Sequence, residues 1–138
     1  MRPATDYAKS ATIAASSRRD ASGHEDHLVD GDLSTSWTPA KGNSTNYVEF
    51  DLGQSRTFNV ARIQENIALG ERVQAYHVEV FESGKWRTIT AGQVIGHKQL
   101  RRFPTTAARR LRLVIEKASA LPAISEFGLH FNLRLAGP

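Results

Sequence analysis

The chain has 138 residues, which is enough for one compact domain but not comfortably for two. Hydrophobic residues make up 40% and charged residues 23% of the sequence, a globular composition that excludes a disordered chain. The absence of cysteine excludes disulfides, thiolate metal sites and a cysteine nucleophile. The net charge is +4, but the basic residues come as short doublets and no nucleic-acid-binding motif accompanies them, so we expect no nucleic acid partner.

The N-terminal third of the chain has little regular pattern. Residues 1–10 are expected to form a frayed leader and residues 11–138 a single domain, whose first candidate strand covers residues 12–16. Residues 16–46 are polar, rich in turn-forming residues and almost without periodicity, which predicts a long loop. Loops longer than about 12 to 15 residues in compact domains tend to be functional, so we expect a site in this segment.

Strands are predicted for the rest of the chain, because apolar and polar residues alternate there. Val48, Phe50 and Leu52 share one face of a strand over residues 47–52, and Gly53 ends it. The same period predicts strands over residues 76–80, 111–115 and 127–135, and further candidates cover residues 57–66, 86–91 and 98–103. About eight strands in one short domain predict an all-β fold, an antiparallel sandwich or barrel.

Two motifs carry a resemblance to a known family. Residues 28–37 read LVDGDLSTSW, and residues 47–53 read YVEFDLG. In this order they resemble the discoidin family, also called the coagulation factor five/eight type C domain, which includes the family 32 carbohydrate-binding modules. The resemblance runs from about residue 11 to residue 132 and implies an eight-stranded antiparallel jelly-roll β-sandwich.

A narrower resemblance rests on three later segments. IQENI at residues 63–67, GERV at 70–73 and IGHK at 95–98 are similar to the C-terminal domain of bacterial family 29 alpha-L-fucosidases. This resemblance implies a non-catalytic carbohydrate-binding module that accompanies a glycoside hydrolase, with a glycan ligand and a catalytic domain elsewhere in the parent chain. We expect the parent protein to be secreted, periplasmic or at the cell surface.

The long loop carries the candidate metal ligands Asp30, Asp32 and Thr35. Calcium takes six to eight oxygen ligands, and a turn around Gly31 can aim carboxylates and carbonyls at one point. The family resemblance implies a structural calcium here and adds Glu126 from the last strand. The alternative is that the two aspartates make ordinary turn hydrogen bonds and Thr35 caps a short turn.

The candidate ligand-binding residues lie in two predicted connections: Glu65, Asn66 and Arg72 in one, His97 and Lys98 in the other. Loop ends present convergent polar side chains, whereas sheet faces are used for packing. In galactose-binding members of the family, an arginine stands where Glu65 and Asn66 fall here, so galactose specificity is not implied. The alternative for Glu65 and Arg72 is a surface ion pair, which is worth at most about 1 kcal/mol.

The aromatic and histidine side chains have two interpretations each. Trp37 and Trp86 could stack on sugar rings, but we favour packing against the sandwich for both. His77 and His130 alternate with apolar neighbours, which favours solvent-facing strand positions.

We expect no enzymatic activity, because no paired carboxylates, nucleophile elbow or phosphate loop is found. No apolar run approaches the roughly 20 residues of a membrane span. Two rival functions remain open beside glycan binding. One is a structural domain that packs on a fucosidase catalytic barrel without its own sugar site, and the other is a protein- or lipid-surface adhesion module.

Overall fold

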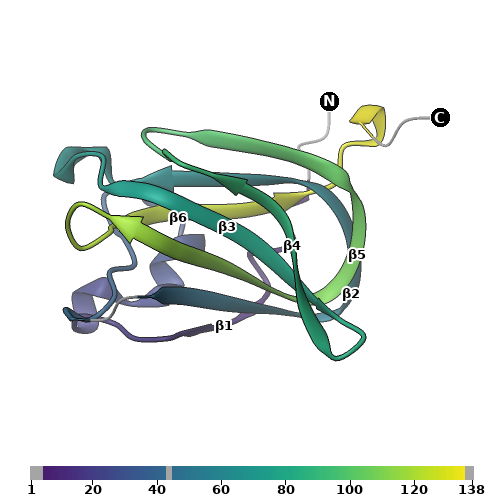
Figure 1. The fold of residues 1–138 in the computed structure, drawn as a ribbon, viewed down its shortest axis with the longest axis horizontal. Coiled ribbons are helices and arrows are strands. Elements are labelled where there is room, and N and C mark those ends of the chain that lie inside the picture. Colours follow the sequence, from purple (N-terminus) through teal and green to yellow (C-terminus); the bar gives the residue numbers. More distant parts are fainter. Residues whose placement is uncertain (1–4, 43–44, 136–138) are drawn as a thin grey trace.

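The computed structural model describes residues 5–42 and 45–135, which form the antiparallel all-β sandwich predicted from the sequence (Figure 1). The strands are β1 (Thr12–Ala15), β2 (Asn46–Glu65), β3 (Val73–Glu82), β4 (Lys85–Gly92), β5 (Gln99–Ala118) and β6 (Ile124–His130). Four short 3-10 helices lie in the connections: η1 (Ala21–Gly23), η2 (Glu25–Val29), η3 (Ile67–Leu69) and η4 (Leu133–Leu135). Within the described residues, no helix is long and apolar enough to cross a membrane.

The strands pair in the order β1-β2-β5-β3-β4, and β6 pairs with β2. β2 and β5 are long strands that bend at one end of the molecule, so that each contributes to both layers (Figure 1). The pairing of β2 with β5 shifts register between Asp51 and Arg56, where Gly53 has a φ of 81°. It shifts again opposite Pro104, which has no N–H to donate to the ladder.

These bends explain why the described part of the chain has six strands where the sequence predicted eight. The predicted strands over residues 47–52 and 57–66 are the two halves of β2, and those over 98–103 and 111–115 are the two halves of β5. A bulge redirects a strand without ending it, so turn-forming residues between two apolar runs do not require a strand boundary.

The core lies between the layers and is built from the residues that the alternation placed inward. Val48 and Phe50 of β2, Leu111 and Leu113 of β5, and Phe127 and Leu129 of β6 are fully buried. The Phe50 and Phe127 rings stack with their centroids 4.6 Å apart. This packing holds the ends of the strands, and the connections between them, in fixed positions.

The predicted last strand is too long. Residues 127–135 alternate in hydrophobicity, but β6 ends at His130, and η4 follows. Asn132 ends the strand because its backbone N–H donates to Asn59 Oδ1 at 2.8 Å, while its own Oδ1 accepts from the Arg134 N–H at 3.0 Å. Leu133 is consequently 77% exposed, so the alternation beyond His130 does not reflect burial.

The expected leader also differs from the structure over the residues that are described. The Tyr7 N–H donates to the Leu129 carbonyl at 2.9 Å, and Asp6 Oδ1 accepts from the Leu129 N–H at 3.0 Å. Ala8 is fully buried. Residues 6–8 therefore pack against β6 rather than fray.

Candidate functional site

Several connections gather at one end of the sandwich, at the left of Figure 1, where η3 and the connection between β4 and β5 lie. A pocket of about 500 Å³ opens between them, lined by residues 33–34 and 64–69 and by His97. This volume is in the range of small-molecule sites. The pocket thus combines a segment of the long loop with both connections in which the sequence predicted ligand contacts.

Glu65 is the buried anchor of this end of the molecule. Its side chain lines the pocket, yet the residue is only 4% exposed. Glu65 Oε2 accepts from the backbone N–H groups of Arg72 at 2.8 Å and Val73 at 3.3 Å, and Oε1 accepts from the Gly96 N–H at 2.9 Å. The carboxylate therefore holds the two pocket-forming connections together, instead of forming the surface ion pair considered above.

The Arg72 side chain also links connections, because it hydrogen-bonds to the segment of η3 and to the connection between β5 and β6. Its guanidinium donates to the carbonyls of Leu69 at 3.1 Å and Leu121 at 2.8 Å. Asn66 is 8% exposed, lines the pocket and donates from Nδ2 to the Ser34 carbonyl at 3.2 Å. Asn66 therefore joins η3 to the long loop. Arg72 is not among the described residues that line the pocket, although one of its acceptors, the Leu69 carbonyl, belongs to a lining residue.

His97 and Lys98 are both exposed, but only His97 lines the pocket. The His97 carbonyl accepts from Gln64 Nε2 at 3.3 Å, which fixes the backbone on which the imidazole is carried. Of the five predicted ligand-binding residues, the structure brings Glu65, Asn66 and His97 together at the pocket.

The predicted metal loop lies beside β6, as the resemblance implied. Glu126 Oε1 accepts from the Gly31 N–H at 2.9 Å, across 95 residues of sequence. Asp30 Oδ1 accepts from the Asp32 N–H, and Asp32 Oδ1 accepts from Ser34, which are the turn hydrogen bonds of the alternative interpretation. The carboxylates of Asp32 and Glu126 are thus directed at backbone N–H groups.

Three oxygens of this loop nevertheless crowd together. Thr35 Oγ1 lies 2.5 Å from Asp30 Oδ2 and 3.0 Å from the Asp32 carbonyl oxygen. A hydroxyl has one hydrogen and can donate fully to only one of these acceptors. This trio suits a hard cation, although no group of three or more His, Cys, Asp or Glu side chains among residues 5–42 and 45–135 is arranged to hold a metal ion.

Burial raises the pKa of Glu126, which is 4% exposed, and the carboxylates of Asp30 and Asp6 raise it further. The Arg62 guanidinium and the Gly31 N–H act in the opposite direction but do not outweigh burial. A buried carboxyl group in this position favours a nearby positive charge.

Both tryptophans lie away from the pocket. Trp37 is fully buried and donates from Nε1 to the Ser17 carbonyl at 3.1 Å. Trp86 is half-buried at the β3–β4 hairpin, where the Arg112 guanidinium lies 4.0 Å from its ring centroid. The packing interpretation is therefore the right one for both residues.

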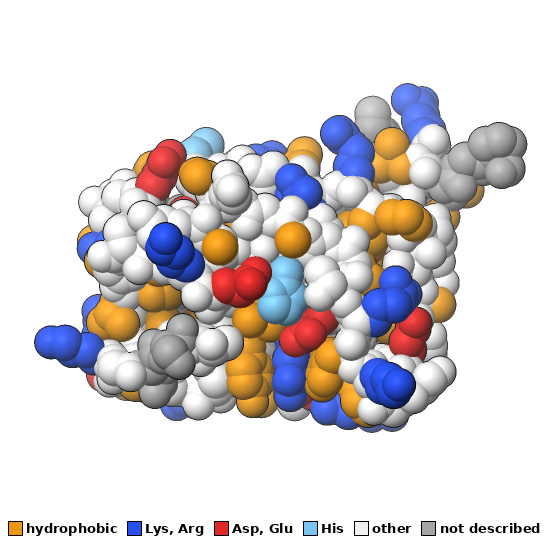
Figure 2. Space-filling view, viewed as in Figure 1, with side chains coloured by type: hydrophobic (Ala, Val, Ile, Leu, Met, Phe, Trp, Pro, Cys, Tyr) orange, Lys and Arg blue, Asp and Glu red, His pale blue; other side chains and the backbone are white. Residues whose placement is uncertain are grey.

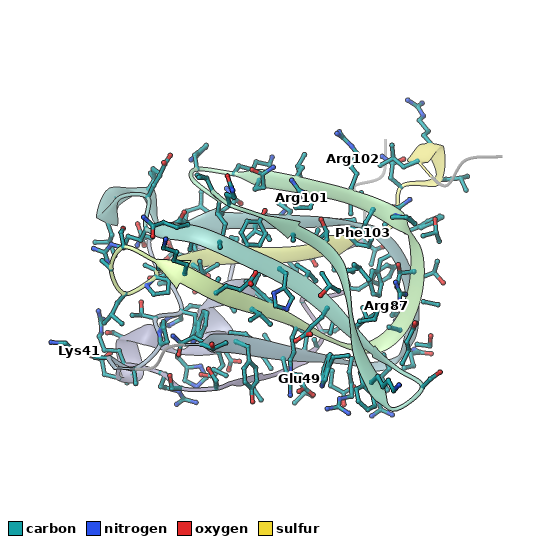
Figure 3. The ribbon with its side chains drawn as sticks, in the orientation of Figure 1. Lys41, Glu49, Arg87, Arg101, Arg102 and Phe103 are labelled. Carbon is teal, nitrogen blue, oxygen red and sulfur yellow. The ribbon has the colours of Figure 1, made fainter. Side chains whose placement is uncertain are left out.

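The two strand histidines are half-buried, and each lies close to one polar partner. His77 Nδ1 lies 3.1 Å from Glu116 Oε2, and His130 Nδ1 lies 2.9 Å from the Thr5 carbonyl. Figure 2 shows basic and acidic side chains interleaved over one face of the molecule, without one continuous basic surface on that face. The labelled side chains illustrate this dispersion, with Lys41 projecting from the loop end and Arg87 at the other (Figure 3).

Sequence reasoning missed the aliphatic side chains of the site. Leu33, Ile67 and Leu69 line the pocket and are 49%, 48% and 47% exposed. The available signal was an apolar run, Ile67-Ala68-Leu69, placed in a predicted turn rather than in a strand. Apolar residues in a turn have no core face to occupy, so they indicate a contact surface.

Comparison with known proteins gives consistent matches. The F5/8 type C domain family matches residues 12–127. A rice protein (Oryza sativa subsp. japonica) assigned as alpha-L-fucosidase 1 is 39% identical over 127 residues, which cover 89% of this chain and 25% of the rice protein. The chain thus spans about a quarter of the length of that curated relative.

The similar solved structures include fucosidases and chitosan-binding modules. A Ruminococcus gnavus GH29 fucosidase in complex with fucose is 28% identical with a TM-score of 0.87, over 97% of this chain and 28% of that one. Chitosan-binding module 2 of a Paenibacillus sp. IK-5 chitosanase/glucanase, in complex with chitotriose, is 22% identical with a TM-score of 0.80, over 91% of this chain and 99% of the module. The likeness to the module shows the fold alone, and the resemblance to fucosidases predicted from the sequence is confirmed.

Proposed function

Because the chain belongs to the F5/8 type C domain family, we propose that it is a carbohydrate-binding accessory domain that binds a glycan in the pocket between η3 and the β4–β5 connection. The observation that carries this proposal is the pocket itself. It combines an exposed imidazole with buried amide groups, at an end of the sandwich held rigid by Glu65. Convergent polar groups in a preformed pocket are the usual form of a small-molecule site.

The proposed contacts are His97 and Asn66. The imidazole of His97 can donate one hydrogen bond and accept another, which matches the hydroxyl groups of a sugar. Asn66 lines the pocket and uses Nδ2 for the Ser34 carbonyl, so its amide oxygen is the atom proposed to accept from a sugar hydroxyl. A site with a few such bonds is expected to have a dissociation constant between about millimolar and micromolar.

The parent chain is proposed to carry a glycoside hydrolase catalytic domain, as in the fucosidases of which this chain covers about a quarter. The domain itself is proposed to bind without turnover. Its pocket carboxylate, Glu65, accepts three backbone hydrogen bonds, so both of its oxygens already have structural partners. Release of the leaving group from a chromogenic fucoside by the purified chain, abolished in Glu65→Gln, would contradict this.

The test of the binding site compares two adjacent exposed residues. We expect titration with monosaccharides to shift backbone amide resonances of residues 64–69 and 97. His97→Ala should weaken binding by about 1 to 3 kcal/mol, whereas Lys98→Ala, outside the pocket lining, should leave affinity within about twofold. Shifts confined to other parts of the sandwich, or none at millimolar sugar, would favour the purely structural domain instead.

We also propose that one calcium ion binds at the Asp30–Thr35 loop. Asp30 Oδ2, Thr35 Oγ1 and the Asp32 carbonyl supply the crowded oxygens that support it. Glu126 contributes negative charge from β6 while it holds the Gly31 N–H. The ion would hold in place the loop whose residues Leu33 and Ser34 line the pocket. This role would be structural and not catalytic.

A further inference from the structure

We propose that the pocket selects uncharged sugars that carry a methyl group, either a 6-deoxyhexose or an N-acetylated sugar. The inference rests on the proposed glycan-binding function and specifies its ligand. It starts from the three aliphatic side chains at the pocket, Leu33, Ile67 and Leu69, which we call the aliphatic rim.

The aliphatic rim is a concentration of exposed apolar surface. Seven large hydrophobic side chains among the described residues are strongly exposed, and three of them form the rim. Single exposed aliphatic residues are common and need no explanation. Three at one pocket, from two segments 34 residues apart, indicate a surface that is covered when the ligand is bound.

The backbone that carries the rim is fixed before any ligand arrives. The Leu33 carbonyl accepts from Ser125 Oγ at 3.0 Å, and the Leu69 carbonyl accepts from Arg72 Nε at 3.1 Å. The Gly70 N–H closes η3 onto the Ile67 carbonyl at 3.0 Å. Preorganised contacts lose little conformational entropy on binding, so even a small apolar group gains affinity there.

The described residues of the pocket lining also offer no unengaged carboxylate to bind an amine. Glu65 is the carboxylate in the lining, and it is buried under three backbone N–H groups. The Arg72 guanidinium is likewise directed at two carbonyls. Burying a cationic amino sugar without a counter-charge is costly, so the ligand should be uncharged.

The rim then decides between sugars of the same stereochemistry. Among the described residues that line the pocket, the His97 imidazole is the one aromatic ring, so we do not assign recognition to stacking on Trp, Tyr or Phe. Leucine and isoleucine side chains gain by covering a methyl group, whereas a hydroxyl pressed against them loses its hydrogen bonds to water. A methyl-bearing sugar is the ligand that satisfies both the aliphatic rim and the polar floor.

The experiment uses sugar pairs that differ by one group and follows backbone amide shifts of the full chain. L-Fucose is compared with L-galactose, which has a hydroxyl on C6, and N-acetylglucosamine with glucose. We expect at least about fourfold tighter binding of the methyl-bearing member in one pair, which corresponds to about 0.8 kcal/mol. A preference within the first pair would indicate a 6-deoxyhexose ligand, and a preference within the second pair would indicate an N-acetylated ligand.

Matched variants show whether the rim causes the preference. Leu33→Asn and Leu69→Asn keep the side-chain shape and remove its apolar character, and each should reduce the preference to less than twofold. Leu133→Asn on η4, 77% exposed and outside the pocket lining, is the control and should leave the preference unchanged. The amide spectrum of each variant reports whether it is folded, and with two rim variants the test does not depend on either one alone.

The outcomes separate this inference from the proposed function. Equal affinity within both pairs, with shifts at residues 64–69 and 97, would overturn the methyl selectivity and leave glycan binding in place. A preference that survives in both rim variants would also overturn it. No shifts with any of the four sugars would overturn the selectivity and the proposed function together.

Discussion

Glu49 lies on the outer face of β2 between two arginines of β5. Its Oε2 accepts from Arg110 Nε at 2.8 Å, and its Oε1 accepts from Arg112 Nε at 3.2 Å. Burial alone would raise the pKa of Glu49, but the hydrogen bonds and charges of the two guanidinium groups outweigh it and hold the pKa below its usual value. The carboxylate form is therefore favoured in the folded protein.

This pKa shift predicts a pH-dependent stability. Because the pKa of Glu49 is lowered on folding, its contribution is present above the unfolded-state pKa near 4.5 and is lost as pH falls through the lower folded value. Glu49→Gln should lower the free energy of unfolding at pH 7 by about 1 kcal/mol, measured by urea denaturation. The difference from the wild type should shrink below pH 4, and a difference that stays constant from pH 7 to pH 3 would contradict the assignment.

Tyr76 gives a prediction of the opposite sign. The residue is fully buried, its hydroxyl has no hydrogen-bond partner among the described residues, and burial raises its pKa. An unsatisfied buried hydroxyl is destabilising, so Tyr76→Phe should raise the free energy of unfolding by about 1 kcal/mol. Tyr47→Phe, at a half-buried ring, is the control and should change it by less than about 0.5 kcal/mol. A Tyr76→Phe variant that is less stable than the wild type would indicate a bound partner for the hydroxyl.

At the scale of elements, the strands were predictable because burial on one face imposes a period of two. Val48, Phe50 and Leu52 all lie in the core, as their alternation required. The joining of residues 47–52 and 57–66 into one bent strand was not predictable, since a glycine between two apolar runs marks either a turn or a bulge. Which of the two forms depends on pairing with β5, which is distant in sequence.

The candidate site was only partly predictable for the same reason. Loop ends could be identified from the sequence, and His97, which was predicted to lie in one of them, lines the pocket. The orientation of Glu65 depends on the N–H groups of Arg72 and Gly96. These groups lie elsewhere in the sequence and come within reach of Glu65 only when the chain folds. A local pattern records residue types but not these non-local hydrogen bonds, so the sequence could not show that Glu65 also anchors the connections.

The anchoring role of Glu65 leads to an element-scale prediction. Glu65→Ala leaves the N–H groups of Arg72, Val73 and Gly96 without their acceptor, and it should cost about 3 kcal/mol of stability. Amide hydrogen exchange at Val73 and Gly96 should accelerate more than in β6. Glu71→Ala, an exposed neighbour, should cost less than about 0.5 kcal/mol. Equal losses in the two variants would rule out the anchoring role.

At the scale of the whole molecule, the two ends of the sandwich have different tasks. The bends of β2 and β5 close one end with continuous backbone, while the connections at the other end are long enough to form a pocket (Figure 1). The long loop reaches this pocket end and is tied to the sandwich by the paired backbone bonds of Trp37 and Ile124, at 2.8 and 3.0 Å. Stability of the loop and shape of the pocket are therefore coupled.

The calcium proposal tests this coupling. Free calcium at about one hundred times its dissociation constant should raise the free energy of unfolding by about 2.7 kcal/mol, because the ion binds only the folded loop. Asp30→Asn should remove most of this gain, since Asp30 Oδ2 is one of the crowded oxygens, whereas Asp26→Asn, an exposed aspartate of the same loop, should keep it. Thermal unfolding of the ion-stripped protein with and without calcium measures the effect. An unchanged melting temperature on adding calcium would mean that the turn hydrogen bonds of Asp30 and Asp32 alone hold the loop.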